Sequence, residues 1–183
     1  LSETRLREIP AFLLIPMIEE QWESLSYTEA QHELRILLDK KIEARLIADV
    51  GIGCFLSGGI DSAIVVDTVA RKTSSDIETF SISYVSKYGS KTNVDRTESQ
   101  FARGFAKKRN LKFNEVLIDS HDGFELFKTQ IVEGGQPFSV SSIIGVLAIS
   151  KAASEKGIKV LLSGDAADEA FLGYEWYRDL NFG

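Results

Sequence analysis

Residues 57–62, Ser-Gly-Gly-Ile-Asp-Ser, are the segment whose residue types and spacing point most clearly to chemistry. The two glycines permit backbone conformations that other residues avoid, and they let a ligand approach the main chain. A helix is expected to begin near Ile60 or Asp61, and the free N–H groups of its first turn favour an anion of phosphate size. The hydroxyl groups of Ser57 and Ser62 add further donors. The segment therefore predicts a phosphate-binding loop.

The carboxylate of Asp61 is unexpected in a site for a bare phosphate, because the two negative charges would repel each other. A divalent cation between them removes the conflict. Mg²⁺ suits the position, because it binds one or two carboxylates together with phosphate oxygens. The alternative interpretation is that Asp61 only caps the helix. The sequence contains neither the Walker pattern G-x-x-x-x-G-K-[ST] nor the dinucleotide fingerprint G-x-G-x-x-G.

A second polar segment, residues 163–169, carries three acidic side chains within five residues: Asp165, Asp168 and Glu169. Acidic residues at a helix start can simply complement the helix dipole, and that explanation suits Glu169. Asp61 and Asp168 lie far apart in the sequence, yet they could bind the same Mg²⁺ if the fold brings them together. Two carboxylates that close are costly without a cation between them.

These segments are expected to be positioned by alternating strands and helices. Apolar and β-rich runs predict strands at residues 50–56, 77–84, 112–118 and 158–162. Apolar spacing predicts helices at residues 26–48, 63–72, 98–109, 121–132 and 142–155, with an extended segment at 9–24 and a polar loop at 86–94. Such alternation implies βαβ units and a mainly parallel sheet with helices on both faces. The predicted fold class is therefore a doubly wound α/β fold.

In a sheet of this kind, ligands bind beyond the carboxyl ends of the strands, at the point where the strand order reverses. Segments 57–62 and 163–169 each follow an apolar strand, so both must emerge at the same edge of the sheet. This geometry is the reason to expect one site from the two segments.

Local patterns predict how two of the helices begin and pack. Ser26 and Glu29 have the spacing of a capping box at the start of the first helix. Phe101, Phe105 and Ala106 are expected to form the core-facing stripe of the helix at residues 98–109.

Composition and charge restrict the possible function classes. Hydrophobic residues make up 44% and charged residues 26% of the 183 residues, which is typical of a globular domain. The net charge is −6 without a Lys/Arg-dense stretch, which argues against a nucleic-acid partner. The single cysteine, Cys54, favours a reducing, cytoplasmic location. The longest apolar run, residues 11–18, is far shorter than the roughly 20 residues that span a bilayer, so no membrane partner is expected.

Both motifs resemble those of a known family. Residues 57–62 are similar to the SGGxDS pyrophosphate loop of the N-type ATP pyrophosphatases, and residues 162–174 resemble the LSG[DE]xxDExFxGY segment of the asparagine synthetase branch. Several ligase and thiolation families share the first motif, whereas the pair is specific. The resemblance covers residues 26–177 and, more loosely, the start of the chain. It implies an interdomain or linker segment at residues 1–25 and an ATP pyrophosphatase (synthetase) domain at residues 26–183.

The resemblance implies the adenine nucleotide alpha hydrolase-like, Rossmann-like version of the fold, with ATP and Mg²⁺ as cofactors. The roles that it implies are pyrophosphate binding by Ser57, Gly58, Gly59 and Ser62, Mg²⁺ binding by Asp61 and Asp168, adenosine binding by Leu56, Ile82 and Gly164, and catalysis by Asp61 and Asp165, with Asp165 near the reacting carboxylate or amine.

The reaction implied by the resemblance is attack of a substrate carboxylate, with aspartate as the first expectation, on the α-phosphorus of ATP. Pyrophosphate leaves, an acyl-adenylate forms, and ammonia then displaces AMP. In the family, the ammonia comes from glutamine on a glutaminase domain that this chain lacks. A homodimer is a further expectation. The first residue, Leu1, is not methionine, and a helix expected at residues 175–183 runs to the last residue, so we expect a fragment truncated at both ends.

Departures from the family pattern leave the acceptor substrate open. Gly135-Gln136 stands where relatives often have an acidic pair, and Leu172 and Trp176 replace the usual Gly and Arg. The catalytic lysine of the family would lie beyond Gly183. The alternatives are therefore a lactam-forming synthetase, a sugar or peptide amidotransferase, or an ATP-binding module without catalysis.

Other residues admit simpler interpretations. Cys54 lies in an expected strand and is interpreted as a buried apolar residue. His121, beside Asp122 at an expected helix start, is interpreted as a neighbour of the helix cap. Tyr174, Trp176 and Tyr177 follow the acidic segment and could either line the substrate pocket or pack in the core.

Overall fold

The computed structural model describes residues 24–73, 77–85, 93–136 and 142–179. The extended segment expected at residues 9–24 falls almost entirely outside these ranges, as does most of the polar loop expected at residues 86–94. The chain forms two compact units, residues 1–40 and residues 41–183, and the sheet belongs to the second unit. Within the described ranges, every helix is too short or too polar to cross a bilayer.

The helix α2, Tyr27–Glu43, begins at the predicted capping box. The backbone N–H of Ser26 donates to Oε2 of Glu29 at 2.9 Å, and the backbone N–H of Glu29 donates to Oγ of Ser26 at 3.4 Å. The prediction that this helix continues to Ala48 is wrong. The backbone tightens after Glu43, where the N–H of Leu46 bonds to a carbonyl three residues earlier, at 3.0 Å, instead of four.

Four strands form a parallel sheet: β1 Ile52–Phe55, β2 Glu78–Tyr84, β3 Lys112–Ile118 and β4 Val160–Leu162. Their order is β3-β2-β1-β4, so β1 lies between β2 and β4. The chain progresses from β1 through β2 to β3 and then crosses to the other side of β1 for β4. The strand order therefore reverses between β1 and β4, which is where doubly wound sheets bind ligands.

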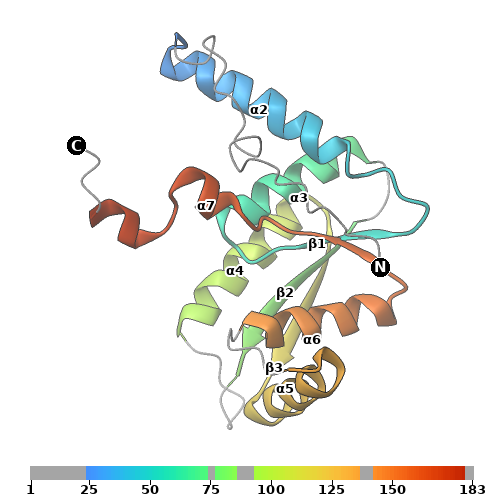
Figure 1. Cartoon of the computed structure of the whole chain (residues 1–183). Helices are drawn as coiled ribbons and strands as arrows, with labels where there is room; N and C mark the ends of the chain where they lie inside the picture. The colour runs from blue at the N-terminus through green and yellow to red at the C-terminus, as the bar shows by residue number, and fades with distance from the viewer. Residues whose placement is uncertain (1–23, 74–76, 86–92, 137–141, 180–183) are drawn as a thin grey trace, which may run out of the picture. The chain divides into compact units, whose positions relative to one another are not determined.

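Helices cover both faces of the sheet, as predicted (Figure 1). One face carries α3, Ile60–Lys72, and α4, Asn93–Lys108, whereas the other is covered by α6, Ser142–Glu155, with α5, Ser120–Gly134, beside it. Successive residues at the end of β1 and directly after it point to opposite faces of the sheet. Cys54 and Leu56 belong to the core cluster under α3 and α4, and Phe55 packs against the cluster under α6. The doubly wound α/β fold is therefore confirmed.

Several element bounds differ from those predicted. The strand at residues 112–118 and the helix at residues 142–155 are confirmed, whereas α4 begins at Asn93 instead of residue 98. The strands β1 and β4 are shorter than expected, because the ladder between them spans three residue pairs. The short helix α7, Ala167–Phe171, follows β4. The α-helix expected from residue 175 is a 3₁₀-helix, η2, Glu175–Asp179, where the structure describes it.

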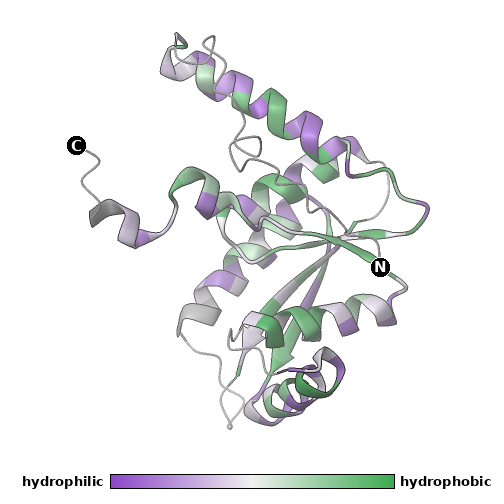
Figure 2. Cartoon of the chain, viewed as in Figure 1, coloured by the Kyte–Doolittle hydropathy of each residue, from purple (hydrophilic) through white to green (hydrophobic). Residues whose placement is uncertain are grey.

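The residues of α4 that face the sheet differ from those predicted. Ala102 and Ala106 are fully buried, whereas Phe101 is 65% exposed and Phe105 is partly buried. The two alanines lie four residues apart on one helix face, and their small side chains let α4 approach β2 and β3 closely. The prediction that Phe101 faces the core is therefore wrong. Figure 2 shows β1 and β4 mainly in hydrophobic colours, whereas the turns of α2 alternate between hydrophilic and hydrophobic colours.

Candidate active site

The loop between β1 and α3 is closed by hydrogen bonds between its own residues. The backbone N–H of Ser57 donates to Oγ of Ser62 at 3.2 Å, and the two serine hydroxyls are 3.0 Å apart. The hydroxyl of Ser62 donates to the carbonyl of Gly59 at 3.0 Å, and the N–H of Gly59 donates to Oγ of Ser57 at 3.3 Å. Ser62 is buried and Ser57 is exposed. Ser62 therefore holds the loop in shape, while Ser57 borders the solvent.

Gly58 can be occupied by no larger residue without distortion. Its φ of +97° lies in a region that favours glycine. A Cβ atom at this position would overlap the carbonyl oxygen of Glu98 and lie 3.2 Å from the carbonyl carbon of that residue. The backbone of α4 thus lies directly against the loop. This contact fixes the loop on the face of the sheet that α3 and α4 cover.

The start of α3 is arranged to receive an anion. Gly59 is the N-cap residue, in an extended conformation, and among the described residues no side chain caps the helix through it. The N–H groups of the first helical turn have no partners within the helix, and the helix dipole adds a partial positive charge at this end. The predicted helix start at Ile60 is confirmed.

The segment after β4 lies on the start of α3, as the topology predicts. A Cβ atom at Gly164 would be 2.8 Å from the backbone nitrogen of Ser62, 2.9 Å from the carbonyl carbon of Asp61 and 3.0 Å from the Cβ of Asp61. The two polar segments therefore meet where the strand order reverses. Glycine at position 164 is what allows the two backbones to approach so closely.

Two carboxylates come together at this point. Burial and, secondly, the negative charge of Asp168 raise the pKa of the half-buried Asp61. Asp168 lies in the first turn of α7, whose N-cap residue Ala166 has a φ of +71°. Asp165 is exposed and accepts a hydrogen bond from Oγ of Ser163 at 2.8 Å. Asp61 is thus close enough to Asp168 for the charge of Asp168 to act on it, and Asp165, next to Gly164 in the chain, is accessible to solvent.

An aromatic group follows the acidic helix. The hydroxyl of Tyr174 donates to Oε1 of Glu169 at 2.5 Å, and this bond lowers the pKa of Glu169 and raises the pKa of Tyr174 to about 12. The ring of Tyr174 stacks on that of Trp176, with centroids 4.2 Å apart and planes at 11°. Trp176 is 60% exposed, so this group lies at the surface and not in the core. The bond from Tyr174 was not predicted, because it crosses the end of a helix and follows no helical spacing.

Two of the three residues expected beside the adenosine, Leu56 and Ile82, are packed in the fold. Leu56 is fully buried, and its backbone N–H donates to the carbonyl of Phe80 at 2.8 Å. Ile82 is half-buried against α6, where a Cβ atom added to Gly145 would be 2.5 Å from the Cδ1 of Ile82. Both side chains are thus held by packing within the sheet and against its helices. Their contacts with adenosine stay predictions.

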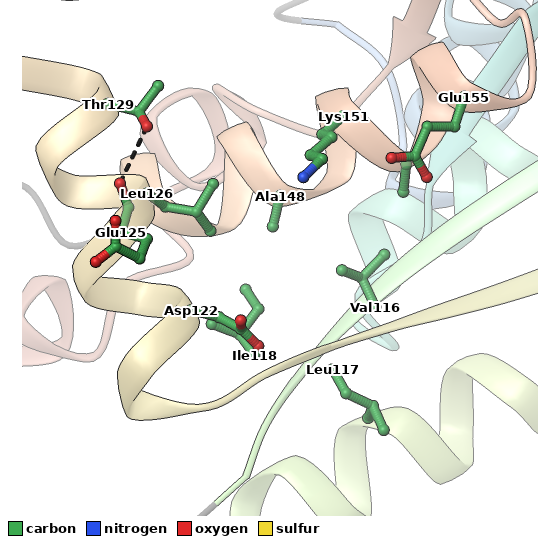
Figure 3. Close-up of a pocket in the computed structure, with 11 residues that line it drawn as sticks. Val116, Leu117, Ile118, Asp122, Glu125, Leu126, Thr129, Ala148, Lys151 and Glu155 are labelled. Carbon is green, nitrogen blue, oxygen red and sulfur yellow. Dashed lines mark hydrogen bonds between the residues drawn. The ribbon is translucent and has the colours of Figure 1, made fainter. Parts of the chain in front are cut away.

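A separate cavity of about 330 Å³ lies between β3, α5 and α6 (Figure 3). Its lining includes Asp122 and Lys151 but none of the predicted site residues. Near its edge, Asp119 caps α5 by accepting hydrogen bonds from the backbone N–H groups of His121 and Asp122, both at 2.8 Å. His121 is thus a neighbour of a helix cap, as interpreted from the sequence.

Comparison with known proteins decides the family. The asparagine synthase family matches residues 33–183 of this chain. The chain belongs to the asparagine synthase family. A glutamine-hydrolysing asparagine synthetase from Bos taurus is 26% identical over 181 residues, which cover 94% of this chain and 30% of that protein. A putative glutamine-hydrolysing asparagine synthetase from Methanocaldococcus jannaschii is 34% identical over 143 residues, 75% of this chain and 25% of that protein. The chain thus spans less than a third of the length of these synthetases.

A solved structure places this chain in its fold group. The glutamine-dependent NAD⁺ synthetase from Acinetobacter baumannii, in complex with ADP, superposes with a TM-score of 0.52 at 21% identity and covers 82% of this chain and 28% of that chain. The adenine nucleotide alpha hydrolase-like fold is therefore confirmed for the described part of the chain.

Proposed function

We propose that this chain is the ATP-using part of an amide ligase of the asparagine synthetase type. The observation that carries the proposal is the meeting of Asp61 and Asp168 at the point where the strand order reverses. A helix start without a side-chain cap and a glycine loop lie at the same point. Membership of the asparagine synthase family supports the same conclusion.

The residues at this point fit Mg²⁺. Asp61 and Asp168 supply carboxylate oxygens, which hard divalent cations prefer, and each carboxylate is costly beside the other while no cation neutralises them. Mg²⁺ held by these two residues would supply the charge neutralisation that a leaving pyrophosphate needs.

The chain's own groups would bind and orient the rest of ATP. The hydroxyl of Ser57 and the N–H groups at the start of α3 would donate to the pyrophosphate, in a loop that Gly58 and Ser62 hold in shape. Such preformed donors stabilise charge as it develops and need no rearrangement during the reaction. Leu56, Ile82 and Gly164 would border the adenosine.

The acceptor would be a small carboxylate, with aspartate as the first candidate. Its carboxylate oxygen would attack the α-phosphorus of ATP, pyrophosphate would leave, and ammonia would displace AMP from the acyl-adenylate. Asp165, exposed and oriented by Ser163, would lie near the reacting carboxylate or amine. The synthetases that this chain resembles are named glutamine-hydrolysing, so we expect ammonia from glutamine in the whole protein.

A specific observation favours a second candidate, a related adenylating synthetase with another acceptor. Gly135 has a φ of +73° and ends α5, with its N–H bonded to the carbonyl of Ile131. The position where relatives often carry an acid is thus a helix cap in this chain. An acid at this position could bind the ammonium group of aspartate. Its absence would suit an acceptor that carries fewer positive charges than aspartate.

Phosphorus NMR tests the proposal. The protein is incubated with MgATP, ammonium and a panel of amino acids that includes aspartate. We expect AMP and pyrophosphate, and the amino acid that triggers them identifies the acceptor. Formation of ADP and phosphate would contradict attack at the α-phosphorus. Mg²⁺-dependent ATP binding without products for any acceptor would favour a binding module instead.

A further inference from the structure

The turn after α7 folds back tightly onto Asp168. Leu172, with a φ of +57°, ends the helix, and its backbone N–H bonds to the carbonyl oxygen of Asp168. The N–H of Gly173 donates to the same oxygen at 3.0 Å. One carbonyl thus receives two amide donors, which brings residue 173 directly beside residue 168.

Gly173 has no room for a side chain because the carboxylate of Asp168 occupies the space. A Cβ atom at position 173 would overlap Oδ1 of Asp168, lie 2.9 Å from its Cγ and lie 3.2 Å from its Cα. The φ of Gly173 lies outside the left-handed region, so glycine is needed here for space and not for backbone conformation. The missing Cβ therefore determines where the carboxylate can lie.

We propose that Gly173 is a positioning residue for Asp168. By leaving its Cβ position empty, it leaves room for the Asp168 carboxylate in the place that this carboxylate occupies over the turn. The inference rests on the proposed function, since it takes Asp168 as a ligand of Mg²⁺. It goes further by assigning a role to a residue outside the set predicted to touch the nucleotide or the metal.

The nature of the clash predicts a change at the site and not a loss of the fold. The atoms that an alanine Cβ would overlap belong mainly to the end of the Asp168 side chain, which can rotate away. Residues that orient metal ligands typically cost 10–100-fold in metal affinity when they are changed. We therefore expect Gly173→Ala to bind the cation about 10–100-fold more weakly while the protein stays folded.

The experiment measures Mn²⁺ binding by electron paramagnetic resonance in the presence of ATP, with Mn²⁺ as the probe in place of Mg²⁺. Gly173→Ala is compared with Gly104→Ala, because a Cβ atom at Gly104 would have no atom within 4 Å. Gly104→Ala should keep the parent affinity. Metal-free binding of ATP should be equal in all three proteins, because a purely structural defect would weaken it together with the metal.

Asp168→Asn separates a failure of this inference from a failure of the proposed function. If Asp168→Asn weakens Mn²⁺ binding and Gly173→Ala does not, Asp168 is a ligand and Gly173 does not position it. If Asp168→Asn binds Mn²⁺ like the parent, Asp168 is not a ligand and both proposals are wrong.

A double variant keeps the test decisive if Gly173→Ala does not fold. In Asp168→Ala the carboxylate is gone, so adding Gly173→Ala should cause no further change in folding or in Mn²⁺ affinity. Recovery of folding in the double variant would show that the clash acts through the carboxylate. A double variant that is also unfolded would overturn the inference, because the conflict would then lie in the backbone.

Discussion

The two polar segments of the candidate site are built in different ways. The loop at residues 57–62 is closed by its own hydrogen bonds and leads into a helix of 13 residues. The segment at residues 163–177 contains a helix of only five residues, and most of its acidic and aromatic side chains are exposed. Two of its residues, Ala166 and Leu172, have positive φ without being glycine.

The two segments are also held in place by different contacts. The first loop is fixed by a buried serine and by the backbone of α4. The second segment is fixed by close contacts at two glycines, Gly164 against the start of α3 and Gly173 against Asp168. Changes to the residues that hold the first loop in shape should therefore reduce the stability of the fold, whereas changes in the second segment should mainly affect the site.

Gly58→Ala should have the largest effect on stability. Strain at positive φ costs about 1–3 kcal/mol, and overlap with the backbone of Glu98 adds about 1–3 kcal/mol. We expect urea denaturation to show a loss of about 2–6 kcal/mol in the free energy of unfolding. Gly59→Ala is the matched control, because Gly59 has a φ of −75° and its added Cβ would be 3.4 Å from the nearest atom. Equal losses in the two variants would contradict the assignment.

Asp61→Asn should have the next largest effect, and on binding instead of folding. Loss of a direct ligand should exceed the range of about 10–100-fold seen for residues that only orient ligands. We expect MgATP affinity, measured by calorimetry, to fall at least about 100-fold, which corresponds to about 2.7 kcal/mol. Asp122→Asn, an exposed position on α5, is the control and should bind MgATP like the parent. An Asp61→Asn variant that binds MgATP normally would refute the metal assignment.

Ser62→Ala should destabilise the first loop by about 1–3 kcal/mol, because two backbone groups lose their hydrogen bonds to the buried Ser62 hydroxyl, each bond worth about 0.5–1.5 kcal/mol. These groups are the N–H of Ser57 and the carbonyl of Gly59. Chemical denaturation measures the change, and Ser57→Ala is the control at an exposed hydroxyl. If Ser57→Ala destabilises the protein as much as Ser62→Ala does, the loop is not held by the buried serine.

The parts of the fold that could be predicted are those with local causes. Apolar runs specify the strands, and the capping box of Ser26 and Glu29 specifies the start of α2. The meeting of the two polar segments followed from the parallel topology alone. The exposure of Phe101 could not be predicted, since it depends on how closely Ala102 and Ala106 let α4 approach the sheet.

The second segment was less predictable because tertiary contacts, and not local sequence patterns, determine its conformation. Its turns use positive φ at Ala166 and Leu172, where residue type gives no indication of such a conformation. Its bond from Tyr174 to Glu169 and its contact at Gly173 depend on where a very short helix ends. Tertiary contacts determine that point, and the sequence pattern does not reveal it.

The pH dependence of stability should sharpen the comparison at Asp61. Because burial and Asp168 raise its pKa, the folded protein holds the proton of Asp61 more tightly than the unfolded chain does. The contribution of Asp61 to stability is therefore full below its ordinary pKa and is lost as pH rises through the raised value. Without metal, Asp61→Asn should be more stable than the parent at pH 7, by less than about 3 °C in Tm, since solvent screens the pair. A difference that persists at pH 3 would contradict the electrostatic cause.

Tyr174→Phe should have the smallest effect, although it removes one hydroxyl just as Ser62→Ala does. Its partner Glu169 is exposed, so solvent can replace the lost bond, and we expect Tm at neutral pH to fall by less than about 2 °C. The bond raises the pKa of Tyr174 to about 12, so its contribution is full below the ordinary pKa of tyrosine and is lost as pH rises through about 12. Ultraviolet titration should show an ionisation near pH 12 in the parent that the variant loses. A fall in Tm as large as that of Ser62→Ala would mean that the second segment is held by its own hydrogen bonds, as the first loop is, and the contrast between them would disappear.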